Sequence, residues 1–280
     1  MPTHLTGLLL ALASAASWGG GDFAGGLATR RGNVFSVLVV AALSGFVLLL
    51  LGVLVVGEAL PDRWSMVWAA ASGASGGLGI AALYRALAIG RAATVAPSAA
   101  VTGAVLPLIV ASATAGFPAP LQQVGFVIAI VAIWLSSRGP SDDGRPARRG
   151  LPLAMIAGVF FGGFFVFLGR VAEGPVLAPI AIARFATLVV AVIAAGVTRS
   201  GKLPRRSLIL ACLAGLLDTG GNACYLISTQ FTRLDVAAVM ASIYPAVTVL
   251  LSRFFIKEKI SKAQWIGIAG ALTAIALIAA

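Results

Sequence analysis

Long apolar segments alternate with short polar ones along nearly the whole chain, and each apolar segment approaches the length of about 20 residues that spans a bilayer. The pattern predicts an all-α integral membrane protein with ten transmembrane helices. Their expected ranges are 5–29, 33–57, 64–89, 92–114, 119–138, 150–171, 175–198, 206–231, 234–256 and 262–279. The longest polar stretch contains Gly-Pro-Ser-Asp-Asp-Gly-Arg-Pro, a composition typical of linkers. We therefore expect a first five-helix unit (1–138), a connecting loop (139–149) and a second five-helix unit (150–280).

Composition agrees with this pattern. Hydrophobic residues make up 60% of the 280 positions, charged residues only 10%, and the mean hydropathy is +1.03. Such a chain cannot place its apolar residues inside a water-soluble core alone, so the bilayer is an expected partner.

The two halves of the chain resemble each other. At an offset of 142, residues 69–135 align with 211–277 without a gap. The non-alanine matches include Gly73 with Gly215, Gly79 with Gly221, Arg91 with Arg233, Gln122 with Gln264 and Gly125 with Gly267. Because each half has five helices, an odd number, one half must be inverted relative to the other. Inverted repeats commonly place a substrate site near the midplane between the halves.

The net charge of +11 comes from basic residues near the helix ends. All but four of the 20 basic residues lie near odd-numbered connections; the exceptions are Arg63, Arg170 and Arg233, near even-numbered connections, and Arg184, inside a predicted helix. The positive-inside rule then predicts cytoplasmic odd connections and both termini outside the cytoplasm. Since membrane topology explains these charges, nucleic acid is not an expected partner.

A polar stripe follows the predicted helix 206–231. Gly215, Asp218, Asn222, Tyr225 and Thr229 recur at intervals of three and four, so they share one helical face that must look into the bundle. A carboxylate at this depth is costly unless it is paired or functional. Three roles are open to Asp218: a structural pair with Arg184, transfer of a proton or another coupling ion, or binding of a cationic group on a substrate.

The first predicted helix carries a second such face, with Ser14, Trp18 and Asp22 at intervals of four. Trp18 is the deeper candidate for a central cavity. Asp22 is a candidate for ion coupling or charge pairing, but it lies nearer the expected cytoplasmic end. There, snorkelling or an ion pair with Arg30 or Arg31 is the competing interpretation.

Tyr84 on the third predicted helix lies close to the repeat equivalent of Tyr225. Together with Trp18, Asp218 and Asn222, these tyrosines form the predicted substrate cavity, since aromatic walls with polar tips suit amphipathic or cationic solutes. Placement of Tyr84 in an interfacial aromatic belt is the alternative.

Three prolines fall inside predicted membrane helices. Pro97 and Pro107 lie in the fourth and Pro245 in the ninth, where each is expected to interrupt the helix and free a carbonyl group. Such breaks often flank a transported substrate, although a purely structural kink is an equal alternative.

No pattern indicates an enzyme. The single histidine is His4, at the terminus; no glycine-rich phosphate loop precedes a helix, and no His, Cys or carboxylate cluster has metal-ligand spacing. We therefore expect no catalytic residues, no metal and no organic cofactor, with a proton or cation as the possible coupling ion. A passive channel or lipid scramblase is the second rival to a transporter.

Particular residues give the chain a family resemblance. The stretch Ala-Ser-Trp18-Gly19, the end Tyr84-Arg85-Ala86-Leu87 of the third helix, and the closing Lys257-Glu258-Lys259-Ile260-Ser261, with Gln264 and Gly267 beyond it, resemble EamA-type members of the drug/metabolite transporter superfamily. The resemblance covers the whole chain, although Gly116-Phe117-Pro118 stands where the first half should carry the acidic motif.

The resemblance implies a secondary transporter that exports small metabolites, amino acids or drug-like amphipathic compounds by alternating access around a midplane cavity. It implies the bacterial inner (plasma) membrane as the location, and small-residue helix spacings suit a monomer or homodimer. It also implies cytoplasmic termini, which conflicts with the distribution of basic residues; we retain the orientation given by the charges.

Overall fold

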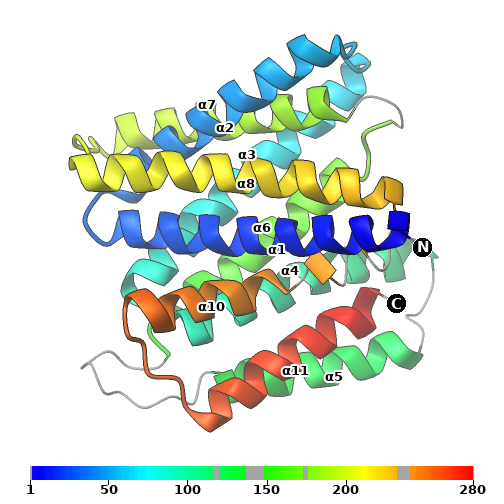
Figure 1. Cartoon of the computed structure of the whole chain (residues 1–280), viewed down its shortest axis with the longest axis vertical. Coiled ribbons are helices and arrows are strands. Elements are labelled where there is room, and N and C mark those ends of the chain that lie inside the picture. Colours follow the sequence, from blue (N-terminus) through cyan, green and yellow to red (C-terminus); the bar gives the residue numbers. More distant parts are fainter. Residues whose placement is uncertain are drawn as a thin grey trace.

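The computed structural model describes residues 2–115, 120–136, 148–172, 176–231, 237, 240–241 and 243–279, and in these ranges the chain is helical with no strand. The helices of the first half are α1 (Pro2–Thr29), α2 (Val34–Val56), α3 (Arg63–Ile89), α4 (Ala92–Ala115) and α5 (Pro120–Ser136). Those of the second half are α6 (Leu151–Leu168), α7 (Leu177–Val197), α8 (Arg205–Phe231), α10 (Tyr244–Phe255) and α11 (Lys262–Ala279). They lie side by side as one bundle (Figure 1). The all-α prediction is confirmed.

The predicted helix 234–256 is described mainly from Tyr244 onward, and most of its first part lies outside the described residues. In the described residues, α2, α3, α6, α7 and most of α8 are long and apolar enough to cross a membrane. Shorter apolar helices lie within α4, α5, α10 and α11.

The helices turn large apolar side chains outward and small ones inward. Leu54, Val55 and Val56 of α2 are 69%, 86% and 67% exposed, whereas the buried residues are dominated by alanine. An outer surface of this kind is unfavourable in water and suited to lipid, and small inner residues allow close helix packing without a hydrophobic drive. The chain is a multi-pass integral membrane protein.

The helix contacts obey an approximate two-fold exchange between the halves. Exchanging α1 with α6, α2 with α7, α3 with α8, α4 with α10 and α5 with α11 converts the α1–α8 contact into α6–α3, and α2–α8 into α7–α3. The same exchange converts α1–α10 into α6–α4, and it leaves the α2–α7 and α5–α11 contacts unchanged.

Individual contacts follow the same exchange at the sequence offset of 142. Gly73 of α3 packs directly on the backbone of Ala183 of α7, and its counterpart Gly215 of α8 packs directly on the backbone of Ala41 of α2. In both places a Cβ atom would collide with the opposing main chain, so only glycine permits the approach.

A second pair of equivalent contacts lies one turn farther along. Gly77 of α3 faces Thr187 of α7, and Thr219 of α8 faces Gly45 of α2. The glycine is on α3 in one contact and on α2 in the other, and the threonine is on the partner helix each time, so each crossing has one small and one branched residue. The two halves that are similar in sequence are therefore also similar in helix packing.

Two glutamates show that the exchange also inverts the halves. Glu58, just after α2, accepts hydrogen bonds from the first backbone N–H groups of α7, at Leu177 (3.0 Å) and Ala178 (3.1 Å). The end of α2 thus meets the beginning of α7, and these two-fold-related helices run antiparallel. A two-fold axis that relates antiparallel neighbours lies across the helices, in the plane of the membrane.

The two-fold exchange places the corresponding contact at the other end of the bundle, where Glu258 directly follows α10. Its carboxylate accepts from the N–H groups of Ala92 (3.1 Å) and Ala93 (3.2 Å), which begin α4, and lies 3.7 Å from the guanidinium of Arg91. Each glutamate therefore joins the end of a helix to the beginning of its two-fold partner, where the helix dipole favours negative charge.

The prolines of the fourth and ninth predicted helices lie in different settings. α4 continues through Pro97 and Pro107, so the predicted interruption of this helix is not found. Pro245 lies in the first turn of α10, where proline is favoured because its missing N–H would have no partner in the helix. Neighbouring helices can compensate the backbone groups that an internal proline frees.

Candidate substrate site inside the helix bundle

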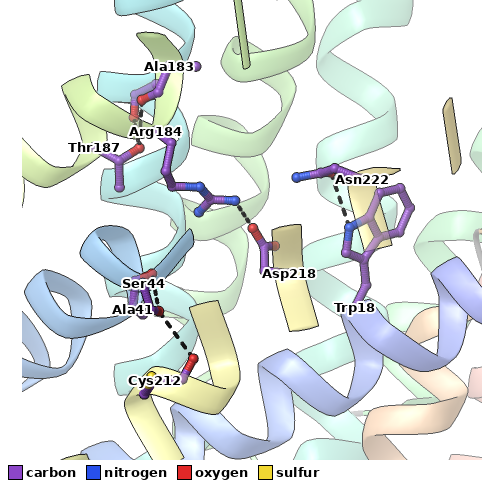
Figure 2. A network of polar contacts seen from close by, with 10 residues as sticks. Trp18, Ala41, Ser44, Ala183, Arg184, Thr187, Cys212, Asp218 and Asn222 are labelled. Atoms are coloured by element: carbon purple, nitrogen blue, oxygen red, sulfur yellow. Dashed lines mark hydrogen bonds and ion pairs between the residues drawn. The ribbon is translucent and has the colours of Figure 1, made fainter. Parts of the chain in front are cut away.

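An ion pair lies in the middle of the bundle. The Arg184 guanidinium of α7 donates to the Asp218 carboxylate of α8 (Figure 2). Asp218 is midway along α8, and Gly45 of α2 leaves room beside the guanidinium. The side chain of Arg184 is 9% exposed and that of Asp218 26%, so the carboxylate is the more accessible partner. Of the three roles open to Asp218, the pair with Arg184 is the one that the structure forms.

Trp18 of α1 connects the two halves one turn of α8 beyond Asp218. Its indole Nε1 donates to the side-chain oxygen of Asn222 on α8, at 3.2 Å (Figure 2). The Trp18 ring lies 5.8 Å from the ring of Tyr225 and 6.1 Å, edge to face, from that of Tyr244 on α10. Three of the predicted cavity residues, Trp18, Asn222 and Tyr225, are thus brought together, each of them half-buried.

These polar residues face the inside of the bundle. Successive residues of a helix are about 100° apart, so the exposed Leu213, Leu216 and Ile227 lie on the side of α8 opposite to Asp218 and Asn222. On α1 the exposed Leu9 likewise lies opposite to Trp18, and the exposed Leu5 and Leu12 lie more than 100° from Trp18 around the helix. The surface that the polar side chains keep accessible is therefore interior and not lipid-facing.

Tyr84 of α3 and Asp22 of α1 form a further part of the candidate site. Tyr84 is 3% exposed, and its ring lies against Gly25 of α1, where a Cβ atom would collide with it. This burial rules out the interfacial belt as the position of Tyr84. The phenol lies within electrostatic range of both Asp22 and Arg184.

Asp22 is half-buried and forms no ion pair with Arg30 or Arg31 in the part of the chain that the structure describes. The charge partner suggested by its position in the sequence is therefore not found. Tyr84 and Tyr244 lie within electrostatic range of it.

The sequence-based predictions assigned no role to Tyr244, and none to the two glutamates as helix caps. Tyr244 precedes Pro245 in the ninth predicted helix, and an aromatic residue with a polar tip at that depth was the available signal. Glu58 and Glu258 each directly follow an apolar segment, but which helix N-terminus they reach depends on the packing of the two halves.

The site contains groups for binding and no group set for metal catalysis. Among the described residues, no cluster of three or more His, Cys, Asp or Glu could hold a metal ion. An ion pair, a further carboxylate, an amide and four aromatic rings can instead bind a small solute by charge, hydrogen bonds and stacking.

Fold and site together define an α-helical membrane protein of two inverted halves with a polar interior. Residues 148–280 match the model of the EamA-like transporter family, which is part of the drug/metabolite transporter superfamily. The resemblance predicted from the sequence is confirmed for this second half.

A solved structure, described only as "Crystal structure of protein", has a TM-score of 0.66 to this chain and covers 97% of both chains at 16% sequence identity. At this identity the likeness shows the shared fold alone. The comparison with curated proteins gave no match.

Proposed function

We propose that the protein is a secondary transporter that exports small metabolites, amino acids or amphipathic drug-like compounds. The EamA-like second half supports transport as the function class. The accessible polar side chains inside the bundle support a binding site, since membrane helices rarely keep such groups without a use.

One observation carries the proposal most directly: the candidate site is built from both halves. Trp18 belongs to the first half, while its partners Asn222 and Tyr225 belong to the second. A solute bound between them would contact both halves, so rocking of one half against the other would carry the site from one membrane face to the other. This is the alternating-access mechanism that we infer for the chain.

A passive channel or lipid scramblase would need a continuous polar path across the membrane. The polar side chains of the candidate site gather near the middle of α8. At each end of the bundle a glutamate, Glu58 or Glu258, connects the end of one helix to the beginning of another. Polar groups gathered in the middle of the bundle suit a carrier better than a pore.

Solute flux in proteoliposomes tests this function. The purified full-length protein would be screened with amino acids, organic cations and amphipathic metabolites, with and without a proton gradient. We expect saturable uptake that is accelerated by solute on the opposite side, which is the signature of a carrier. Trp18→Ala should abolish uptake, while Trp64→Ala, a change at an exposed ring near the start of α3, should leave it intact.

Three results would contradict the proposal. Flux that does not saturate and shows no acceleration by opposite-side solute would indicate a channel. Movement of labelled lipid between the leaflets would indicate a scramblase. Flux equal to that of protein-free vesicles for every solute would exclude transport of the proposed classes.

We also propose that both termini lie outside the cytoplasm, because the basic residues gather at odd-numbered connections. A reporter fused after Ala280 should be active outside the cytoplasm, and one inserted near Arg145 should be active inside. The opposite result at both positions would establish the orientation implied by the family resemblance.

A further inference from the structure

A groove lies between α1 and α10, close to the end of the bundle where both helices terminate (Figure 1). In the middle of the bundle the two helices touch directly. Gly19 packs against the backbone oxygen of Tyr244, and the hydroxyl of Thr248 donates to the carbonyl of Gly19 at 3.2 Å. Beyond this contact the helices leave the groove between them. Its lining includes Phe23, Leu27 and Arg30 of α1, Leu87 of α3, and Ser252 and Ile256 of α10.

The walls of the groove are apolar and reach the outer surface of the bundle. Leu87 packs on Gly26 of α1 and closes the groove on its inner side. On the outer side, the ring of Phe23 lies 5.8 Å from that of Phe255, which is 74% exposed. Exposed phenylalanine rings on a membrane helix face lipid. The groove is therefore open to the bilayer and separate from the candidate substrate site, whose residues do not line it.

The groove is basic where it approaches the helix ends. Arg30 lines it, and the exposed Arg253 lies in the last turn of α10, directly after a residue that lines it. Two further exposed basic residues, Arg31 and Lys257, follow in the chain. The acid nearest in sequence on the α10 side is Glu258, whose carboxylate is already engaged at the start of α4. The groove therefore carries an excess of positive charge.

The repeat indicates that helix packing does not require these charges. Arg30 corresponds to Ala172 at the offset of 142 and to Glu173 at an offset of 143, and Arg253 corresponds to Ala111. The related positions of the other half thus carry no basic residue. Membrane topology accounts for basic residues at this end of the bundle in general, but not for a guanidinium that lines a groove between two helices.

A phospholipid matches this combination of groups. Its phosphate lies at the level of the helix ends, where a guanidinium can bind it through two parallel hydrogen bonds. Its acyl chains continue into the apolar region, in the direction of Phe23 and Leu27. Basic pockets between membrane helices bind anionic lipid head groups in this manner. A free phosphate ion would use the arginines and leave the apolar walls without a ligand.

We propose that the groove between α1 and α10 binds one anionic glycerophospholipid of the surrounding membrane. Arg30 and Arg253 hold its phosphate, and one acyl chain lies along Phe23 and Leu27. Because α1 belongs to the first half and α10 to the second, the bound lipid contacts both halves. It therefore stabilises their present arrangement at this end of the bundle, and its binding should raise the unfolding temperature of the purified protein.

Native mass spectrometry of the full-length protein tests this site, with phosphatidylglycerol and phosphatidylcholine of identical acyl chains as probes. For the wild type we expect phosphatidylglycerol to bind at least about fivefold more strongly than phosphatidylcholine. Arg30→Gln and Arg253→Gln should each weaken phosphatidylglycerol binding by about fivefold. Arg199→Gln is the matched control, because it removes an exposed basic residue after α7 that does not line the groove, and it should bind as the wild type does.

Equal affinities of the wild type for the two lipids would overturn the proposal, as would wild-type affinity in a folded Arg30→Gln protein. If Arg30→Gln does not fold, the exposed Arg253→Gln variant and the lipid selectivity of the wild type still decide the question. Inorganic phosphate is the remaining probe. If it raises the unfolding temperature as much as phosphatidylglycerol does, the groove binds a free anion and the lipid site is excluded. Saturable solute flux by a protein without lipid selectivity would contradict only the groove site.

Discussion

The place of the Arg184–Asp218 ion pair in the second half has a two-fold counterpart in the first half. The helix packing around the two places is alike, but the side chains at the two places differ. At the offset of 142, Asp218 corresponds to Gly76 and Arg184 to Ala42. The glycine contacts on either side of these positions are the same in both halves, yet one place holds a charge pair, and in the other the ring of Phe164 packs on Gly76.

This difference distinguishes the residues that pack the helices from the residues that form the candidate site. The repeated contacts Gly73–Ala183 and Gly215–Ala41 set the spacing of the helices in both halves. The polar residues are not repeated, since Asn222 corresponds to Ile80 and Tyr225 to Leu83. A symmetric scaffold thus carries an asymmetric interior, and that asymmetry marks the candidate site.

The largest expected effect comes from breaking the charge pair. Asp218→Asn leaves the buried Arg184 without its anion, and one-sided removal of a buried pair costs about 3–5 kcal/mol in soluble proteins. We expect a clear fall in the thermal unfolding temperature of the purified protein, measured in detergent.

The control for this prediction removes both charges. Asp218→Asn combined with Arg184→Gln should recover much of the lost stability, because no charge is then stranded. If the single variant is as stable as the wild type, Asp218 and Arg184 do not form a structural pair.

The two glutamate caps should differ in strength. Glu258 is 8% exposed, lies beside Arg91 and caps α4, whereas Glu58 is more exposed and caps α7. Glu258→Gln should therefore cost about 2 kcal/mol and Glu58→Gln about 1 kcal/mol or less, as for hydrogen bonds to buried charges and exposed dipole contacts. Thermal unfolding of the two variants measures the difference, and a larger loss for Glu58→Gln would contradict this ranking.

The counterpart of Asp218 offers a packing test with a matched control. A Cβ atom on Gly76 would lie 2.9 Å from the Phe164 ring, while one on Gly220 of α8 would have no atom within 4 Å. Gly76→Ala should destabilise by about 1–2 kcal/mol through overpacking. Gly220→Ala should be neutral or stabilising by up to about 1 kcal/mol, because alanine favours the helix. Equal unfolding temperatures would mean that Phe164 moves aside freely.

The smallest expected effect concerns the start of α3, outside the membrane. Hydrogen bonds from the Ser65 hydroxyl and backbone N–H hold the pKa of Asp62 below its ordinary value, and the Trp64 N–H adds to this. A lowered pKa means that the ionised carboxylate stabilises the fold above its unfolded-state pKa, and that this contribution is lost as the pH falls through the folded-state value. The difference in unfolding temperature between wild type and Asp62→Asn should therefore shrink below about pH 4. A constant difference at every pH would exclude this linkage.

Much of the scaffold could be predicted because helices that cross a membrane require long apolar segments, which are visible in the sequence. Apolar segments of membrane length marked the helices, and paired glycines at the offset of 142 marked contacts such as Gly73–Ala183 and Gly215–Ala41. The stripe through Asp218 and Asn222 gave the inward face of α8, because only an interior could accept it.

The partners of these side chains could not be predicted in the same way. Periodicity gives the rotation of a helix but not which helix it faces, so the contacts of Trp18 with Asn222 and Tyr244 had no signal of their own. Asp22 was misleading for the same reason, since Arg30 and Arg31 are near in sequence while Tyr84 and Tyr244 are near in space. Pro97 and Pro107 misled because a packed membrane helix can continue through proline.

The central claim is that the asymmetric interior is the transport site. The most direct test measures solute counterflow in proteoliposomes and compares two variants, Asn222→Leu and its two-fold counterpart Ile80→Leu. The substitutions lie at equivalent places on α8 and α3, but only Asn222 contacts Trp18 of the other half. We predict that Asn222→Leu lowers the initial rate by about tenfold or more, equivalent to at least about 1.4 kcal/mol, while Ile80→Leu stays close to wild type. Equal losses in the two variants, or an active Asn222→Leu protein, would contradict this account.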